Sequence, residues 1–523
     1  MDFIRDMENT AKRNIEFNGV VTENGALGYA TSLDKLVDMN FKVASYRNMS
    51  EDEIIADFMA AFKEDPVMAF TWLFFARDVR GGLGERRLFR VCLNAVFNHY
   101  DISKKDLMSI CHLILEFGRA DDLYTVRSCG TNGQFVFCDF VDKTLHSDLQ
   151  SMAEGKPVSL LAKWLKSETA SSIDSRVLAK ETMHALGMTP KEYRQTLSKL
   201  RKYIDVVERK MTAGEWNKID YSKVPSKAAL NYSGAFGRHD EYRYNAYLDA
   251  VKRGEEKINA GTLYPYEIVA KYIEHGFWRS SNRECTELNP TLEEMWKALP
   301  NTVNGKHAGS TIVVADGSVS MTCAACGGSA TALDVANSLA IYFAERMEGP
   351  FKNKYITFSS KPQFVDLNKC VSLREKICEA VAHDECTNTN IEAVFDLMLK
   401  TAVRCGMTQD EMPANVLAVS DMEFDSATYG LVDKALFDGI KAKFEAAGYK
   451  LPRLVFWNVS SRTCVVPIQE NDAGVALVSG FSQNIAEMVM SGELNAKACL
   501  MKVLMKERYA EVRNVARSAF GEF

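Results

Sequence analysis

The stretch STIVVADGSVSM, residues 310–321, indicates the fold class of the C-terminal half. Its run of β-branched apolar residues is typical of a buried strand that ends at Asp316. Further strand-like runs alternate with helical patterns downstream, namely KYITFSS, NVLAVSD, RLVFWNVS and GVALVSG. This alternation predicts a doubly wound, mostly parallel sheet covered by helices on both faces. The nearby PQFVDL segment predicts one antiparallel edge strand.

Upstream of a polar loop at residues 301–310, the periodicity is helical rather than strand-like. From about Leu33 to Pro300, apolar residues recur at i, i+3, i+4 and i+7, and short polar breaks separate the helices. Such serial amphipathic helices predict an array or solenoid without a clean repeat. The expected organisation is an N-terminal extension at 1–30, a helical domain at 31–305, an α/β domain at 306–492 and a C-terminal helix at 493–523.

Composition narrows the class of protein. The chain has 523 residues, 47% of them hydrophobic and 25% charged, with a net charge of −6. These values predict large folded cores and argue against a wholly basic nucleic-acid coat, but they allow local basic surfaces. The N-terminus lacks the apolar core of a signal peptide, and no run of about 18 apolar residues predicts a membrane helix. We therefore expect a monomer in the cytoplasm, or in the host cytoplasm if the protein is viral.

The 13 cysteines are expected to be mostly buried, reduced thiols. Only Cys323 and Cys326 form a close pair, and no second pair of ligands completes a zinc site nearby.

Three predicted strand ends carry oxygen ligands. Because the carboxyl ends of parallel strands meet at one edge of a sheet, these side chains are expected to converge. They suit Mg²⁺ or another hard divalent cation. The alternative is that the serines and aspartates cap the following helices. The predicted metal ligands are Asp316, Ser318, Ser320, Thr389 and Asp421, with Thr387 and Asp425 beside them.

Residues 309–490 resemble a von Willebrand factor A domain, a Rossmann-like fold. The resemblance rests on the family pattern Asp-x-Ser-x-Ser, then Thr, then Asp, in order at successive strand ends. It implies a metal-ion-dependent adhesion site in which the metal keeps one position open for an acidic side chain of a partner. Val319 departs from the pattern, because the family usually has Gly there.

Basic residues gather at three places in the helical half. Arginines read phosphates with two N–H groups, and aromatic rings stack on RNA bases. For 76–90, the alternative is a turn between two helices, with arginines salt-bridged to Asp78, Glu85 or their neighbours. For the cation-rich segment 191–210, the alternative is a solvated helix face with core tyrosines. The third place, 227–248, is expected to be a glycine-interrupted loop running into a helix. The predicted RNA-binding residues are Arg77, Arg80, Arg86, Arg87, Arg90, Lys227, Arg238, His239 and Arg243.

The whole chain resembles the TROVE plus von Willebrand A architecture of the Ro RNA-binding family, and more closely its uncharacterised plant, phage and giant-virus relatives. The resemblance is carried by FFARDVRGGLGERRLFR (74–90), LLAKWLKSE (160–168), VPSKAALNYSGAFGRHDEYRYNAYL (224–248), SDMEFD (420–425), VFWNVSS (455–461) and GVALVSGFSQN (474–484). It implies a HEAT-like helical ring that accepts single-stranded ends of non-coding or misfolded RNA.

The expected function is therefore RNA binding, with an acidic protein partner docked at the metal site. The alternative is a protein-interaction scaffold or virion component that uses the metal site without RNA. No P-loop, GxSxG or HExxH motif points to an enzyme.

Overall fold

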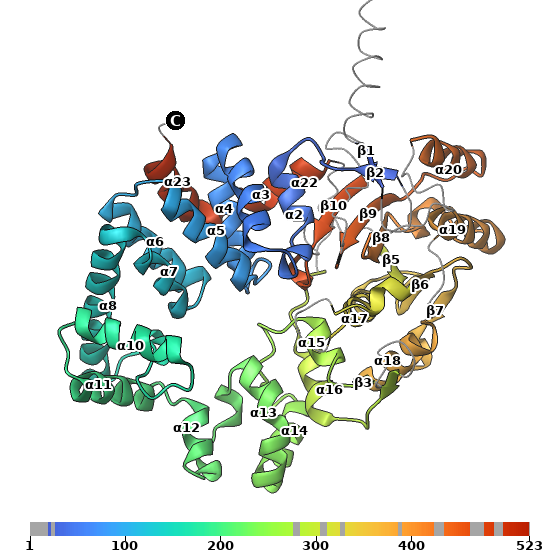
Figure 1. Cartoon of the computed structure of the whole chain (residues 1–523). Helices are drawn as coiled ribbons and strands as arrows, with labels where there is room; N and C mark the ends of the chain where they lie inside the picture. Colours follow the sequence, from blue (N-terminus) through green and yellow to red (C-terminus); the bar gives the residue numbers. More distant parts are fainter. Residues whose placement is uncertain are drawn as a thin grey trace, which may run out of the picture. The chain divides into compact units, whose positions relative to one another are not determined.

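The computed structural model describes residues 19–21, 27–275, 283–303, 311–324, 330–384, 390–422, 434–460, 475–485 and 495–521. The predicted class is confirmed at the coarse level, since the chain combines many helices with one six-stranded mixed sheet (Figure 1). Among the described residues, no helix combines the length and the apolar character needed to cross a membrane.

The sheet has the strand order β10-β9-β8-β5-β6-β7. Its neighbouring strands pair in parallel, except that β7 runs antiparallel to β6, which confirms the predicted edge strand. The strands are β5 (Thr311–Asp316), β6 (Lys354–Phe358), β7 (Phe364–Asp366), β8 (Asn415–Ser420), β9 (Arg453–Asn458) and β10 (Val475–Ser479).

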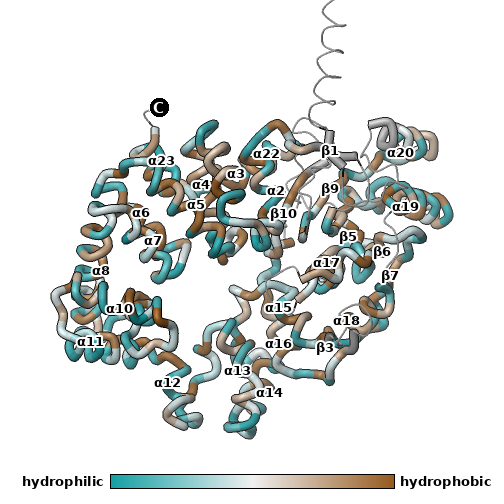
Figure 2. The backbone as a smooth tube through the Cα atoms, viewed as in Figure 1, coloured by the Kyte–Doolittle hydropathy of each residue, from teal (hydrophilic) through white to brown (hydrophobic). Residues whose placement is uncertain are grey.

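Helices pack on this sheet, and its strands β5, β8 and β9 are buried along their full length. Helix α17 (Ala332–Arg346) packs on β5 and is itself almost wholly buried. Its small residues allow close approach to the strands, and a Thr331–Asp334 capping box closes its N-terminus. The other covering helices are α18 (Leu373–Ala382), α19 (Ile391–Cys405), α20 (Lys434–Ala446) and α22 (Ala496–Leu504). The apolar character of β9 and β10 is visible in Figure 2.

The sheet also gathers segments from outside the predicted 306–492 domain. Helix α2 (Lys35–Phe41) packs on β10 and α22. The Asn458 amide donates to the Phe41 carbonyl at 2.8 Å, and the Ala44 N–H donates to Ser479 Oγ at 3.1 Å. Joining this group are β1 (Gly19–Val21), β2 (Leu27–Tyr29), the 3-10 turn η1 (Ser45–Arg47), α15 (Pro265–Val269), β3 (Ile273–His275), β4 (Arg283–Cys285) and α16 (Pro290–Lys297).

The compact unit built on the sheet thus comprises residues 1–53 and 260–506. The predicted boundaries at 31, 305 and 492 differ from this grouping. Local periodicity cannot show which helices find their apolar partners on a distant sheet.

The second unit comprises residues 54–259 and 507–523 and is helical. Within residues 54–259, the main helix contacts join near neighbours in the chain, such as α4 with α5 and α13 with α14. The helices are α3 (Glu51–Glu64), α4 (Pro66–Arg77), α5 (Arg86–His99), α6 (Lys104–Phe117), α7 (Leu123–Arg127), α8 (Gly130–Ala153), α9 (Leu161–Trp164), α10 (Ile173–Ala185), α11 (Pro190–Tyr203), α12 (Val207–Thr212), α13 (Ser226–His239) and α14 (Glu241–Lys252).

The end of the chain returns to the first helices of this unit. Helix α23 (Ala510–Phe520) packs on α4 and α6, and the Phe520 ring lies 5.1 Å from both Phe62 and Phe70. The predicted single helix at 493–523 is therefore wrong. It is two helices, α22 and α23, separated by a 3-10 turn at Glu507–Tyr509, and the two belong to different units.

Candidate functional site

The predicted metal ligands on β5 and β8 lie at the carboxyl edge of the sheet. Because Ala315 pairs with Val419, Asp316 lies beside Ser420, and Asp421 follows directly. Asp316 Oδ2 accepts a hydrogen bond from Ser420 Oγ at 2.5 Å, and both aspartates are about 2% exposed or less. Thr387, Thr389 and Asp425 lie outside the described residues.

The serine hydroxyls turn toward each other at the end of β5. Ser318 Oγ lies 2.8 Å from Ser320 Oγ, and the Ser318 N–H donates to Asp316 Oδ1 at 2.8 Å. Ser318 precedes the 3-10 turn η5 (Val319–Thr322) without making a side-chain capping bond. Neighbouring oxygens around an octahedral Mg²⁺ are about 3 Å apart, so this donor set fits a hard cation.

Valine at position 319 is compatible with this turn. Val319 begins η5, its side chain is 58% exposed, and it is not among the residues with positive φ. A glycine is therefore not required by the backbone here.

No three His, Cys, Asp or Glu side chains converge as metal ligands anywhere in the described ranges. The candidate set instead combines two carboxylates with hydroxyl groups. Of the cysteine pair, Cys323 is exposed and Cys326 lies outside the described residues.

The glycines of the segment 74–90 serve close packing within the chain. A Cβ on Gly82 would lie 1.9 Å from the Phe75 carbonyl oxygen. A Cβ on Gly81 would lie 2.8 Å from Arg508 Nε, in the pair that Arg508 forms with the buried Asp78. Gly82 therefore allows close packing against α4, and Gly81 allows close packing against Arg508 of the same unit.

Three arginines of this segment join Arg119 in what we call the arginine cluster, which consists of Arg77, Arg86, Arg90 and Arg119 around Asp121 and Asp122. Arg77 Nε and Arg90 Nε bond the fully buried Asp122 at 2.8 and 2.6 Å. Arg119 pairs with Asp121 and stacks 3.8 Å from the centre of the Trp164 ring. Arg77 and Arg90 are thus salt-bridged, as the alternative for this segment expected, but to Asp122 rather than to Asp78, Glu85 or their neighbours.

The arginine cluster carries more positive than negative charge. Arg86 is exposed at its edge. Desolvation, followed by repulsion from Arg119 and Arg77, lowers the pKa of Arg86. Burial alone would raise the pKa of Asp121, but its bonds and proximity to Arg119 and Arg90 lower it to about 2. Of the other cations predicted in this segment, Arg80 and Arg87 have exposed side chains.

The segment 224–248 is not a loop running into a helix, as expected, but two consecutive helices, α13 and α14, joined at Asp240. Gly234 and Gly237 lie inside α13 with room for a side chain. The expectation failed because apolar helical spacing outweighs two glycines, which cost a helix only about 1 kcal/mol each.

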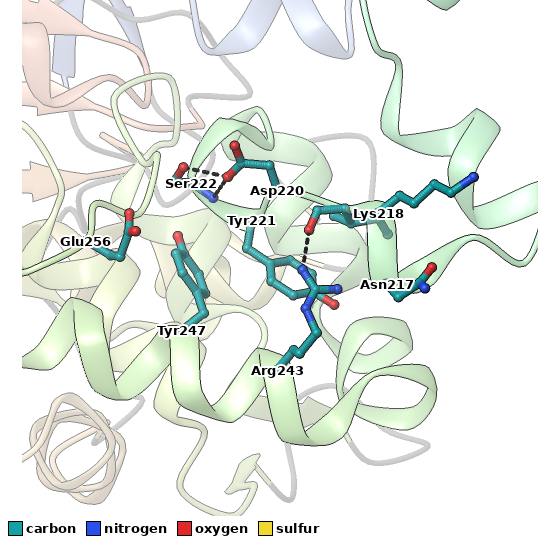
Figure 3. A pocket seen from close by; sticks show the side chains of 9 residues that line it. Asn217, Lys218, Asp220, Tyr221, Ser222, Arg243, Tyr247 and Glu256 are labelled. Carbon is teal, nitrogen blue, oxygen red and sulfur yellow. Dashed lines mark hydrogen bonds between the residues drawn. The ribbon is translucent and has the colours of Figure 1, made fainter.

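The predicted RNA-binding residues of this hairpin have different environments. Arg243 bonds the carbonyl oxygens of Trp216 and Ile219 and the Asp240 carboxylate, which ties it into the wall of a cavity of about 370 Å³ (Figure 3). The His239 ring stacks on Trp216 at 4.3 Å. The side chains of Lys227 and Arg238 are exposed.

Sequence reasoning missed three residues of these sites. Ser420 was passed over because only the strand register places it against Asp316. Arg119 and Trp164 were passed over because they come from segments that look like ordinary helix ends. The sequence FGRADDLY holds a signal, since an arginine stands two residues before adjacent aspartates.

The fold and site together define a class: a helical array combined with an α/β sheet that carries a hydroxyl–carboxylate site at its carboxyl edge. Residues 310–518 match the model described as "Domain of unknown function (DUF7788)", and residues 157–307 match "Domain of unknown function (DUF2828)". The chain is similar to "Uncharacterized protein L728" of Acanthamoeba polyphaga mimivirus, with 27% identity over 516 residues that cover 92% of this chain and 86% of the relative.

Proposed function

We propose that this chain is an RNA-binding protein of Ro type, with the helical unit built as a HEAT-like solenoid that takes non-coding or misfolded RNA. The observation that carries the proposal is the arginine cluster, where four guanidinium groups surround two aspartates. A phosphate at Arg86 relieves the repulsion among these cations. Trp164 and Arg119 add a stacked pair of the kind that nucleic-acid surfaces use.

The test is a gel-shift titration with single-stranded RNA at about 50 and 200 mM salt. Affinity is expected to fall with salt. Arg86→Glu is expected to weaken binding at least about fivefold and to make the salt slope shallower by about one unit, since one phosphate contact is lost. The matched control is Arg404→Glu, which changes the same charge on an exposed residue of α19 in the other unit. Absence of binding at about 50 mM salt would refute the proposal, as would equal losses in both variants.

A second candidate function is metal-dependent docking of an acidic partner by a von Willebrand A-type sheet unit. It is supported by the convergence of Asp316, Ser318 and Ser320, whose oxygens would hold Mg²⁺. A bound cation would give this edge an electrophilic point that a partner carboxylate can reach. The same geometry serves a scaffold or virion component that does not bind RNA.

Metal binding is tested by the thermal stability of the full chain with and without Mg²⁺. At a hundredfold excess over Kd, a bound cation adds about 2.7 kcal/mol. Ser320→Ala should abolish this increase with little change in the metal-free protein, whereas Thr322→Ala, on the same turn, should keep it. An equal Mg²⁺ response in wild type and Ser320→Ala would contradict the assignment.

A further inference from the structure

Helix α11 forms one wall of a cavity of about 280 Å³ in the helical unit, which we call the α11 pocket. Three arginines and three serine or threonine residues are among those that line it: Arg194, Arg201, Arg209, Ser167, Thr169 and Ser198. Arg194, Ser198 and Arg201 lie at i, i+4 and i+7 on α11, so the helix turns them to one side. Arg209 comes from α12, and Ser167 and Thr169 come from the segment after α9.

Arg201 is held rigidly by neutral partners. Its Nε donates to the Ala162 carbonyl at 2.8 Å, Nη2 donates to the Leu165 carbonyl at 2.8 Å, and Nη1 donates to Ser167 Oγ at 2.9 Å. Its neighbour Tyr193 is 1% exposed and donates to the Lys166 carbonyl at 2.9 Å. The guanidinium is therefore preorganised, and its position does not depend on a ligand.

This guanidinium lacks a carboxylate counter-ion in the described part of the chain. Burial lowers the pKa of Arg201, and the phenol groups of Tyr193 and Tyr124 offset only part of this effect. A cation that is more than half removed from water without an anion is costly to maintain. An anion from outside would balance this charge.

Free hydrogen-bond donors remain on the pocket side chains. A guanidinium has five N–H groups, and three of those on Arg201 are used in the bonds above. Ser167 Oγ accepts from Arg201, so its own hydrogen can be donated to a ligand.

The net charge and size of the α11 pocket select the ligand. Glu168 is the acid among the lining residues, and it lies 3.8 Å from Arg194, which leaves two arginines in excess. A phosphate monoester is a dianion or nearly so at neutral pH, and its oxygens match both the guanidinium fork and the hydroxyl donors.

We propose that the α11 pocket binds a phosphate monoester group, carried either by a small metabolite or by the phosphorylated end of an oligonucleotide. Arg201 is the fixed anchor, Arg194 and Arg209 close on the anion from the rim, and Ser167 donates to it. This site does not rest on RNA binding at the arginine cluster, because a small phosphate ester satisfies it equally well.

The experiment is calorimetric titration of the full-length protein with adenosine monophosphate, adenosine, and a decanucleotide with a 5′-phosphate or a 5′-hydroxyl. Binding of adenosine monophosphate with at least tenfold preference over adenosine is expected if the source is a small ester. A tenfold preference for the phosphorylated over the hydroxyl-ended decanucleotide is expected if the source is a nucleic-acid end. Arg194→Ala and Arg209→Ala should each weaken the preferred ligand at least fivefold.

Lys199→Ala is the control, because Lys199 is exposed on the same helix and does not line the pocket. Far-UV circular dichroism should show that all three variants are folded, since the altered side chains project from the helix surface. The proposal is overturned if neither phosphate-bearing probe is preferred over its phosphate-free partner. It is also overturned if Lys199→Ala weakens binding as much as Arg194→Ala does.

Discussion

Replacement of Gly82 by alanine is the sharpest test of how the segment 74–90 is held. The new Cβ would lie 1.9 Å from the Phe75 carbonyl oxygen and 3.0 Å from the Asp78 carbonyl oxygen. Both obstacles are backbone atoms in or beside α4, so neither can rotate away. The glycine-rich turn itself would have to move by about 1 Å or more.

The cost of that movement follows from the bonds it breaks. The turn is tied to α4 by Gly82 N–H to Asp78 O at 3.0 Å, Leu83 N–H to Phe75 O at 3.1 Å, and Glu85 N–H to Ala76 O at 2.7 Å. A buried hydrogen bond contributes about 1 kcal/mol net, so losing two or three of them, with some strain, costs about 2–4 kcal/mol.

Hydrogen exchange measured by mass spectrometry on peptides from α4 and α5 is the suitable assay. A chain of two compact units need not unfold in one step, so a local readout is more direct than a single melting temperature. The loss predicts exchange faster by roughly 30- to 1,000-fold in these helices, because 1.4 kcal/mol is a factor of ten.

Replacements at two other glycines serve as comparisons for the effect of Gly82→Ala. Gly81→Ala should cost less, because its closest obstacle is the flexible Arg508 side chain. Gly237→Ala should stabilise α13 by up to about 1 kcal/mol, because nothing lies within 4 Å of its new Cβ. The reasoning is refuted if Gly82→Ala leaves the exchange of α4 and α5 unchanged, or if Gly237→Ala is as damaging.

Further predictions concern the arginine cluster and the thiols. Asp122→Asn should destabilise the helical unit by about 3–5 kcal/mol, seen as a lower urea midpoint, because it leaves the buried Arg77 without its anion. The folded state lowers the pKa of Asp121 from 3.8 to about 2. Its contribution to the stability of the fold is therefore complete above about pH 4 and is lost between about pH 4 and pH 2. Asp121→Asn should make the stability of the protein less dependent on pH in that window. The exposed thiols Cys323 and Cys405 should react with a thiol reagent under native conditions. Cys92 and Cys111 should react only on unfolding, because both are buried and burial raises their pKa, that of Cys111 to about 12.

The sequence alone determined the class of each half and several local features. The four central residues of TIVVAD and of NVLAVS are all apolar, which is typical of a strand buried on both faces, so the parallel sheet was predictable. The short spacing between KYITF and FVD allowed only a hairpin, and it forms the antiparallel edge. Asp316, Ser318 and Ser320 were predictable as a group because they are neighbours in the chain.

Only the tertiary structure decided which side chains from distant parts of the chain contact one another. Ser420 reaches Asp316 through a strand register that no local pattern encodes. Arg508 passes over the glycine turn to pair with Asp78, more than four hundred residues away in the chain. Arg77 and Arg90, which were predicted to bind RNA, form salt bridges with Asp122. Arg201 instead bonds neutral groups such as Ser167 and has no carboxylate partner among the described residues. Periodicity reports which face of an element is apolar, but the identity of the group that covers or neutralises that face depends on how the chain packs.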